Sequence, residues 1–122
     1  MAWTFEGERP IYLQLTEILQ AQIAAGDYKP GERMPSVRDI AETAGINPNT
    51  VQRAMSELEQ MGLIVTNRTN GRVVADNPEL IGDSRNTRKD ETVRNYYQKM
   101  RDLGYTVEEA LQEAVKYAKG EA

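Results

Sequence analysis

Polar side chains with directional hydrogen-bonding groups gather in residues 49–53 of the 122-residue sequence. Amides and hydroxyls donate and accept hydrogen bonds, and Arg adds a permanent charge and a planar fork of donors. Spaced at about 100° per residue of an α-helix, Gln52, Arg53 and Ser56 fall within about 60° of Asn49, and Thr50 stands beside them. Such a face suits contact with the base edges and phosphates of a DNA major groove.

Three further arginines could join the same surface. Arg38 sits in the first turn of a preceding helix, and Arg68 and Arg72 flank the tip of an expected hairpin. Gly71, at that tip, would let the backbone approach a duplex closely. A DNA contact requires the nearby acids to point elsewhere, since phosphate repels carboxylates. The acids expected to point away are Glu17, Asp27, Asp39, Glu42, Glu57 and Glu59.

Two short helices joined by a tight turn must position these side chains. Ser36 is a good N-cap for a helix over 36–44, with Asp39 at its third position. Asn47 caps the next helix and Pro48 occupies its first position, which predicts a recognition helix over 48–61. Only its first two turns should enter a groove, because carboxylates follow.

The spacing of three small or apolar residues is typical of a helix-turn-helix. Ala41 is small where the helices cross, Gly45 supplies the turn, and Val51 fills the core beneath the second helix. A helix opened by Pro10, with an apolar stripe ending near Gly26, precedes this motif. Trp3 and Phe5 are expected to cover the edge of its core, with a contact to a partner subunit as the alternative.

A β-hairpin follows the helix-turn-helix. Residues 63–67 and 72–75 are rich in β-branched side chains, and Asn70-Gly71 between them favours a type I′ turn. Three helices followed by a hairpin give a winged helix-turn-helix, with residues 68–72 as the wing. We therefore expect a mostly α chain with a small β-hairpin, α+β in class, and a DNA-binding domain over residues 1–76.

Residues 77–122 are expected to form a linker and a two-helix hairpin. The stretch 77–86 has mixed polar composition and predicts a linker or an irregular helix start. Helical periodicity follows over 87–103, and Thr106 with Glu109 forms a capping box for a last helix. Two helices alone bury little apolar surface, so we expect this region to form a dimer. The residues expected at the dimer interface are Val93, Tyr96, Tyr97, Met100, Leu103, Leu111 and Val115.

Composition excludes several classes of function. The chain has no Cys and no His, so the commonest zinc sites and nucleophile–base pairs are absent, and neither a metal, a cofactor nor enzyme activity is expected. No apolar run reaches the ~20 residues of a membrane span, and the N-terminal residues do not resemble a signal peptide, so a cytoplasmic protein is expected. The net charge of −4 argues mildly against nucleic-acid binding unless the cations share one face.

Several segments resemble the GntR family of bacterial transcription regulators. They are PIYLQ at 10–14, KPG at 29–31, MPSVR at 34–38, NTV at 49–51, ELE at 57–59 and GLI at 62–64. The form NPNTV at 47–51, with only two helices after the wing, is similar to the YtrA subfamily. The resemblance implies a homodimer that binds a two-fold symmetric operator and usually represses transcription. It implies DNA contacts at Arg38, Asn49, Thr50, Arg53 and Gly71.

The sequence departs from that family at two positions. Many members carry a basic residue where this chain has Pro48, and another where it has Gln52, so contacts from those positions do not carry over as charge.

The leading hypothesis is a dimeric, sequence-specific DNA-binding repressor. The alternative is a winged helix that serves as a protein-interaction module without binding DNA, which the acidic total supports. A small-molecule effector is left open, with an apolar site lined by Trp3, Tyr97 and Met100 between the two regions as one location.

Overall fold

A computed structural model of the chain describes residues 3–121. Within them, the elements follow the order α1 (Ile11–Ala25), α2 (Val37–Ala44), α3 (Pro48–Gln60), β1 (Ile64–Asn67), β2 (Gly71–Val74), α4 (Pro78–Asp102) and α5 (Val107–Ala118). The predicted fold class, mostly α with a small β-hairpin and a winged helix-turn-helix, is confirmed. Contacts divide the chain into two compact units, Met1–Arg85 and Asn86–Ala122, called here the first and second units.

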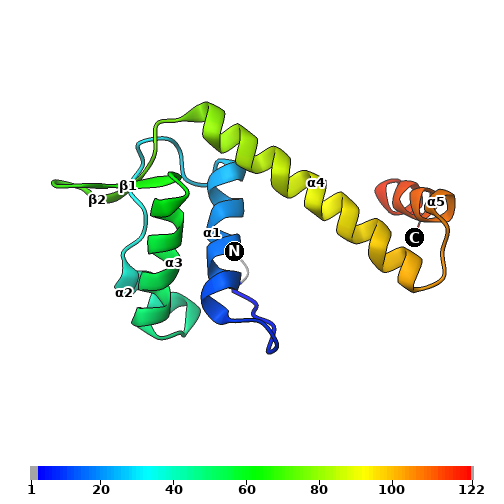
Figure 1. Cartoon of the computed structure of the whole chain (residues 1–122), viewed down its shortest axis with the longest axis horizontal. Coiled ribbons are helices and arrows are strands. Elements are labelled where there is room, and N and C mark those ends of the chain that lie inside the picture. The colour runs from blue at the N-terminus through cyan, green and yellow to red at the C-terminus, as the bar shows by residue number, and fades with distance from the viewer. Residues whose placement is uncertain (1–2, 122) are drawn as a thin grey trace. The chain divides into compact units, whose positions relative to one another are not determined.

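In the first unit, α1 and α3 lie side by side and α2 packs on α3 (Figure 1). The predicted apolar stripe of α1 and the buried side of α3 meet in one core. Its largest fully buried side chains are Leu15, Leu19, Ile23, Ile40, Met55, Leu58, Ile64, Val51 and Val74. Met61, the last residue of the predicted recognition helix, is 40% exposed because it is the C-cap residue, where the chain leaves α3.

The helix-turn-helix has the caps that the sequence predicts. Ser36 Oγ accepts a hydrogen bond from the Asp39 N–H at 3.0 Å, and Asn47 Oδ1 accepts one from the Asn49 N–H at 2.8 Å. Gly45 ends α2 with φ 69°, a left-handed conformation that favours glycine. The start of α1 differs slightly from the prediction, because Pro10 is its N-cap residue and Ile11 its first helical residue.

The wing is an antiparallel hairpin in which Asn67 pairs with Gly71. Three residues therefore form its loop, and the predicted type I′ turn is wrong. That turn needs positive φ at both central residues, whereas Asn70 has negative φ and only Gly71, at 71°, is positive. The Asn67 side chain sets the loop, because its Oδ1 accepts hydrogen bonds from the N–H groups of Thr69 (2.8 Å) and Asn70 (3.3 Å).

The outer edge of β2 is covered by the connection between α1 and α2. The Met34 N–H donates to the Arg72 carbonyl, and the Val74 N–H donates to the Glu32 carbonyl, both at 2.9 Å. Arg33 lies opposite Val73 as an isolated bridge. This short extended segment ties the entry of the helix-turn-helix to the wing.

The N-terminal arm is held by one buried glutamine. Gln14 Oε1 accepts a hydrogen bond from the Glu6 N–H at 2.6 Å, and its Nε2 donates to the carbonyls of Glu6 (2.8 Å) and Arg9 (2.7 Å). Trp3 and Phe5 then pack against the core, as the first of the two alternatives predicts.

The stretch expected to be a linker or an irregular helix start is instead the beginning of a regular helix. Pro78 is the first residue of α4, and Asn77 Oδ1 accepts a hydrogen bond from the Leu80 N–H at 3.1 Å. Leu80 and Ile81 pack against the core of the first unit. The first unit accordingly extends to Arg85, nine residues beyond the boundary expected from composition.

In the second unit, the later part of α4 contacts α5 through Tyr96. The Tyr96 hydroxyl donates to the carbonyl of buried Ala110 at 2.6 Å, and the rings of Tyr96 and Tyr97 meet edge to face at 5.3 Å. The predicted capping box of α5 is confirmed, with Thr106 and Glu109 bonded reciprocally. The hydrogen bonds that the Glu109 carboxylate and Thr106 share lower the pKa of that carboxyl.

Candidate nucleic-acid interface

The first two turns of α3 present the polar face that the sequence predicts. Asn49, Gln52 and Arg53 are exposed, and Thr50 and Ser56 are half-buried. The opposite face of the same turns is buried in the core. Helical spacing accounts for both the exposed and the buried face. On the exposed face, the structure brings together amide, hydroxyl and guanidinium groups.

Arg53 is held against α1 by an aromatic ring. Its Cζ atom lies 3.6 Å from the centroid of the Tyr12 ring. A guanidinium stacked on a ring face keeps the N–H donors at its edge available, so the contact orients Arg53 without consuming its hydrogen bonds. Tyr12 is not among the residues predicted from the sequence. The only feature of the sequence that could have indicated its role is that an aromatic side chain stands just outside the apolar stripe of α1.

Arg38 lies in the first turn of α2 and is 86% exposed at its side chain. It is paired with Glu42, one turn later, at 3.2 Å. An exposed pair of this kind contributes about 0–1 kcal/mol, so a phosphate could replace the carboxylate at little cost.

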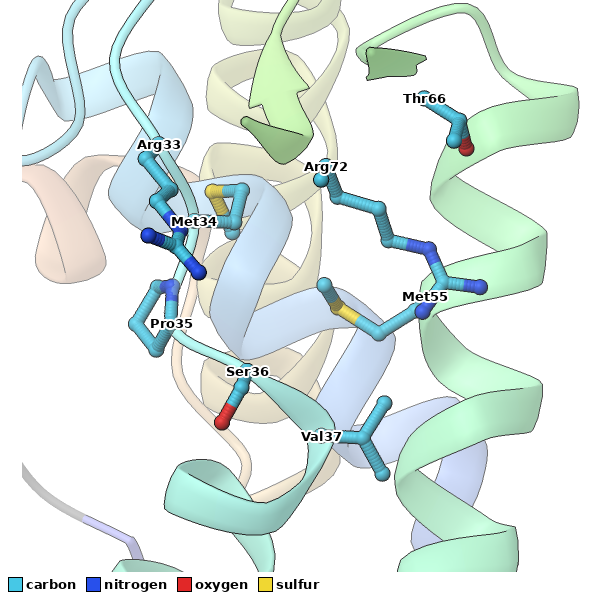
Figure 2. A pocket seen from close by; sticks show the side chains of 9 residues that line it. Arg33, Met34, Pro35, Ser36, Val37, Met55, Thr66 and Arg72 are labelled. Atoms are coloured by element: carbon cyan, nitrogen blue, oxygen red, sulfur yellow. The ribbon is translucent and has the colours of Figure 1, made fainter. Parts of the chain in front are cut away.

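The two arginines of the wing lie in different surroundings. Arg68 is exposed in the loop, as predicted, and Gly71 has the positive φ that closes it. Arg72 instead turns back toward α3, as Figure 2 shows, and its side chain is only 21% exposed. The structure therefore brings Arg68 to the open tip and places Arg72 between the wing and the recognition helix.

Arg72 belongs to a hydrogen-bonded group that joins α3 to the hairpin, called here the α3–wing cluster. Its Nε donates to Glu59 Oε1, and its Nη1 donates to Gln52 Oε1 at 3.3 Å. Thr66, the partner of Arg72 across the hairpin, donates its hydroxyl to the same Glu59 oxygen at 3.3 Å. The expectation that the acids point away from the arginines is wrong for Glu59 and for Glu42, because each pairs with one.

A cavity of about 320 Å³ lies beside this cluster, between the wing, α3 and the start of α2 (Figure 2). Met34, Val37 and Met55 line its apolar part, and Arg33 and Arg72 contribute cationic side chains. Arg33 is not among the predicted site residues. The extended segment that pairs with β2 places Arg33 here. This pairing joins residues forty positions apart, so local sequence patterns do not reveal it.

The residues predicted for a dimer interface all lie in the second unit and are exposed or half-buried. Leu103 is 72% exposed and Leu111 49%, and Val93 and Val115 are also exposed. The remaining three, Tyr96, Tyr97 and Met100, are half-buried. A groove of about 540 Å³ in this unit is lined by Tyr96, Met100, Leu103, Tyr105, Glu113, Ala114 and Tyr117.

The first unit holds a separate cavity of about 360 Å³ beside the N-terminal arm. Trp3, Tyr28, Ile40 and Asp39 are among its lining residues. Burial raises the pKa of the Tyr28 hydroxyl, and the charge of Asp27 adds to the shift. Of the three residues suggested for an effector site, Trp3 thus lines this cavity and Met100 lines the groove of the second unit.

Comparison with known proteins agrees with this geometry. The family model for bacterial regulatory proteins of the gntR family matches residues 11–74, which run from α1 to the end of the wing. The chain belongs to the GntR family. As a GntR-family transcriptional regulator, it carries a DNA-binding winged helix-turn-helix, and its relatives are regulators, not enzymes.

Two relatives from Bacillus subtilis show how far the similarity extends. The HTH-type transcriptional regulator YhcF is 32% identical over 95% of this chain and 96% of its own length. The HTH-type transcriptional repressor YtrA is 41% identical over 56% of this chain and 52% of its own length. The YtrA-like subfamily expected from residues 47–51 and from the short C-terminal region is confirmed.

Solved structures give the same result for the fold. A GntR family transcriptional regulator from Listeria monocytogenes matches with a TM-score of 0.81 and 30% identity, over 92% of this chain and 98% of that chain. The DNA-binding domain of AraR, solved in complex with operator ORX1, matches with a TM-score of 0.55 and 25% identity, over 59% of this chain and 93% of that chain.

Among the described residues, none of the helices combines the length and apolarity needed to cross a membrane.

Proposed function

We propose that this GntR regulator is a dimeric repressor that binds a palindromic operator. The observation that carries the proposal is the exposed polar face of α3, which presents Asn49, Gln52 and Arg53 on a helix whose other side is buried. The wing and the start of α2 add Arg68, Gly71 and Arg38. The similarity to the repressor YtrA and to an operator-bound domain supports DNA as the partner and repression as the outcome.

Each side chain has a role that follows from its chemistry. Gln52 and Arg53 face outward and suit hydrogen bonds to base edges, and Asn49 and Thr50 stand at the start of α3, where docked helices meet bases and phosphates. Arg38 and Arg68 are exposed cations suited to phosphates on either side of the groove. Gly71 brings backbone to the duplex at the wing.

The second unit supports the dimer. Leu103, Leu111 and Val115 remain exposed on a pair of helices with little core of its own. Burying them against the same surface of a second copy would create a two-fold interface, the commonest kind in soluble oligomers. A two-fold dimer would present two recognition helices to half-sites ~34 Å apart, or a multiple of that distance.

Binding to DNA from the upstream region of its own gene tests the proposal. We expect a shifted complex below micromolar protein at low salt, with dimer in solution and a footprint of two inverted half-sites. Affinity should fall by roughly 0.9 log units per log unit of salt for each phosphate neutralised. No shift from a confirmed dimer would overturn the proposal, and a footprint without two-fold symmetry would overturn its palindromic part.

Arg53→Ala tests the recognition surface directly. If Arg53 reads a base, the substitution should weaken operator binding by ~1–3 kcal/mol, measured by fluorescence anisotropy. Gln60→Ala is the matched control, because Gln60 is exposed on the same helix beyond the first two turns. Equal affinities for the two variants would move the base contact to the neighbours of Arg53.

A further inference from the structure

Gln52 is held from one side only. Its carboxamide oxygen accepts a hydrogen bond from Arg72 Nη1 at 3.3 Å, and Gln52 itself lies on the exposed face of α3. A guanidinium donates hydrogen bonds and accepts none, so the amide atom that faces Arg72 must be the oxygen. The orientation of this amide is therefore fixed by chemistry.

The fixed orientation determines what Gln52 can offer to DNA. The oxygen and nitrogen of a planar carboxamide point away from each other at about 120°, as expected for a trigonal carbon. With the oxygen turned toward Arg72 and the wing, the amino group is the part left for a base. Reading adenine requires both atoms side by side on N6 and N7 of one base edge, so the oxygen would have to accept from N6 with its second lone pair while Arg72 occupies the first.

Arg72 is itself held by a carboxylate. Glu59 Oε1 accepts from Arg72 Nε and from the Thr66 hydroxyl, so Glu59 is bonded to both strands of the wing. The Arg72 side chain is only 21% exposed, and its Nε donor is occupied. Arg72 is thus poorly placed for the phosphate contact expected from its position in the sequence.

We propose that Arg72, anchored by Glu59, is a positioning residue that orients the Gln52 amide with its amino group free to donate and so sets the base preference of this regulator at one operator position. A donor at Gln52 matches guanine, through O6 or N7, and thymine, through O4. Adenine offers only N7 and leaves its N6 amino group without a free acceptor on Gln52, so it binds more weakly. Cytosine presents its N4 amino group there and is rejected. This inference deepens the proposed function and rests on it.

The first experiment compares Arg72→Met with Arg68→Met, the same substitution in the same hairpin. Each variant is titrated at several salt concentrations with an operator and with every single-base-pair substitution of it. Arg72→Met should leave the salt slope unchanged and broaden preference at one position, where adenine binding improves about threefold to tenfold relative to guanine or thymine. Arg68→Met should lower the salt slope by about one phosphate and leave all base preferences unchanged.

The second experiment identifies the position. Gln52→Ala should flatten preference at one base pair, and Arg72→Met should act at the same one. Glu59→Gln, which frees Arg72, should broaden that position too. Glu57→Gln is its control, because it makes the same change on the same helix at a carboxylate with no ion-pair partner among the described residues. Thermal melts of all variants exclude a loss of fold, which would weaken every operator equally.

The outcomes separate the inference from the proposed function. If the wild-type chain binds no operator with sequence preference, both are overturned. If it binds with preference, the inference alone is overturned by any of three results: a lower salt slope for Arg72→Met, adenine or cytosine preferred opposite Gln52, or no change at that position in Arg72→Met and Glu59→Gln.

Discussion

At the scale of single residues, the recognition surface is oriented by side chains that do not belong to it. Tyr12 lies on α1 and supports Arg53, and Glu59 lies in the last turn of α3 and holds Arg72. Such supports matter because a side chain already in its binding orientation loses less rotamer entropy when it meets DNA. Substitutions at these residues should therefore change DNA binding without removing a DNA contact.

Tyr12→Leu provides one such test. Loss of the ring removes the cation–π contact with Arg53, which is worth about 0.5–1 kcal/mol at an exposed site, so operator affinity should fall about twofold to fivefold. Tyr12→Phe keeps a ring beneath the guanidinium and should bind nearly as tightly as the wild type. Anisotropy titrations measure both, with thermal melts as the check on fold. Equal binding by Tyr12→Leu and wild type would show that the stacking does not contribute.

These supporting residues explain why the site is only partly predictable from sequence. Helical spacing is local, so the outward face with Gln52 and Arg53 follows from counting residues. The pairing of Arg72 with Glu59, thirteen positions earlier and on another element, depends on how the wing folds onto α3. No local pattern carries that information, and a sequence alone therefore makes Arg72 look like a second free cation at the wing.

At the scale of elements, the helix boundaries are encoded most clearly by capping residues. Ser36, Asn47 and Thr106 each accept the hydrogen bond expected of an N-cap, and the predicted starts of α2, α3 and α5 are correct. These signals work because they satisfy N–H groups that the helix itself leaves unpaired. Asn77 and Pro78 carry the same signal for α4, but the polar composition around them suggested a linker.

The wing loop shows the limit of a dipeptide signal. Asn70-Gly71 strongly favours a two-residue type I′ turn, yet the Asn67 side chain accepts hydrogen bonds from the N–H groups of Thr69 and Asn70 and stabilises a three-residue loop. A side-chain bond of this kind competes with the intrinsic turn preference. The second strand therefore begins at Gly71, one residue before its predicted start, and the hairpin itself remains as predicted.

The capping box of α5 makes the stability of that helix depend on pH. The pKa of Glu109 is lowered in the folded chain, so its carboxylate stabilises the fold above the ordinary Glu value of ~4.3 and loses that contribution as pH falls through the lowered pKa. Glu109→Gln keeps an acceptor for the Thr106 N–H without a charge. We expect the melting temperatures of wild type and variant to differ near neutral pH and to converge in acid.

Circular dichroism melts over this pH range check the prediction, with Glu108→Gln as the control. Glu108 is in the same first turn, but Thr106 bonds Glu109 and not Glu108. A constant difference between Glu109→Gln and wild type at every pH would contradict the assigned role of the charge.

At the scale of the whole molecule, ion pairs between arginines and nearby glutamates explain how an acidic chain can present a surface for DNA. The chain carries 19 acidic and 15 basic residues, yet the α3 face presents Arg53 beside amides and the wing tip presents Arg68. Glu42 and Glu59 are each occupied by an arginine, which reduces the repulsion that they would exert on phosphate. A negative net charge is therefore compatible with a DNA-binding surface. The affinity for DNA should weaken steeply as the salt concentration rises.

Leu111→Glu tests whether two copies act together. Leu111 is 49% exposed in the single chain, so a charge there should leave the fold of the chain largely intact while opposing burial against a second copy. We expect sedimentation equilibrium to show a shift from dimer to monomer, and operator affinity to fall with it. Gln112→Glu introduces the same charge at the next, exposed position of α5 and serves as the control. A fully dimeric Leu111→Glu would exclude this surface from the interface.

The packing of the N-terminal arm has a practical consequence for following the two units. Trp3 is the single tryptophan in the sequence, and it lies against the core of the first unit. Its fluorescence therefore reports the unfolding of that unit, whereas far-ultraviolet circular dichroism sums the helices of both. Coincident transitions would mean that the units unfold as one, and separate transitions would give each its own stability. The chain thus carries an optical label that distinguishes its units without any added dye.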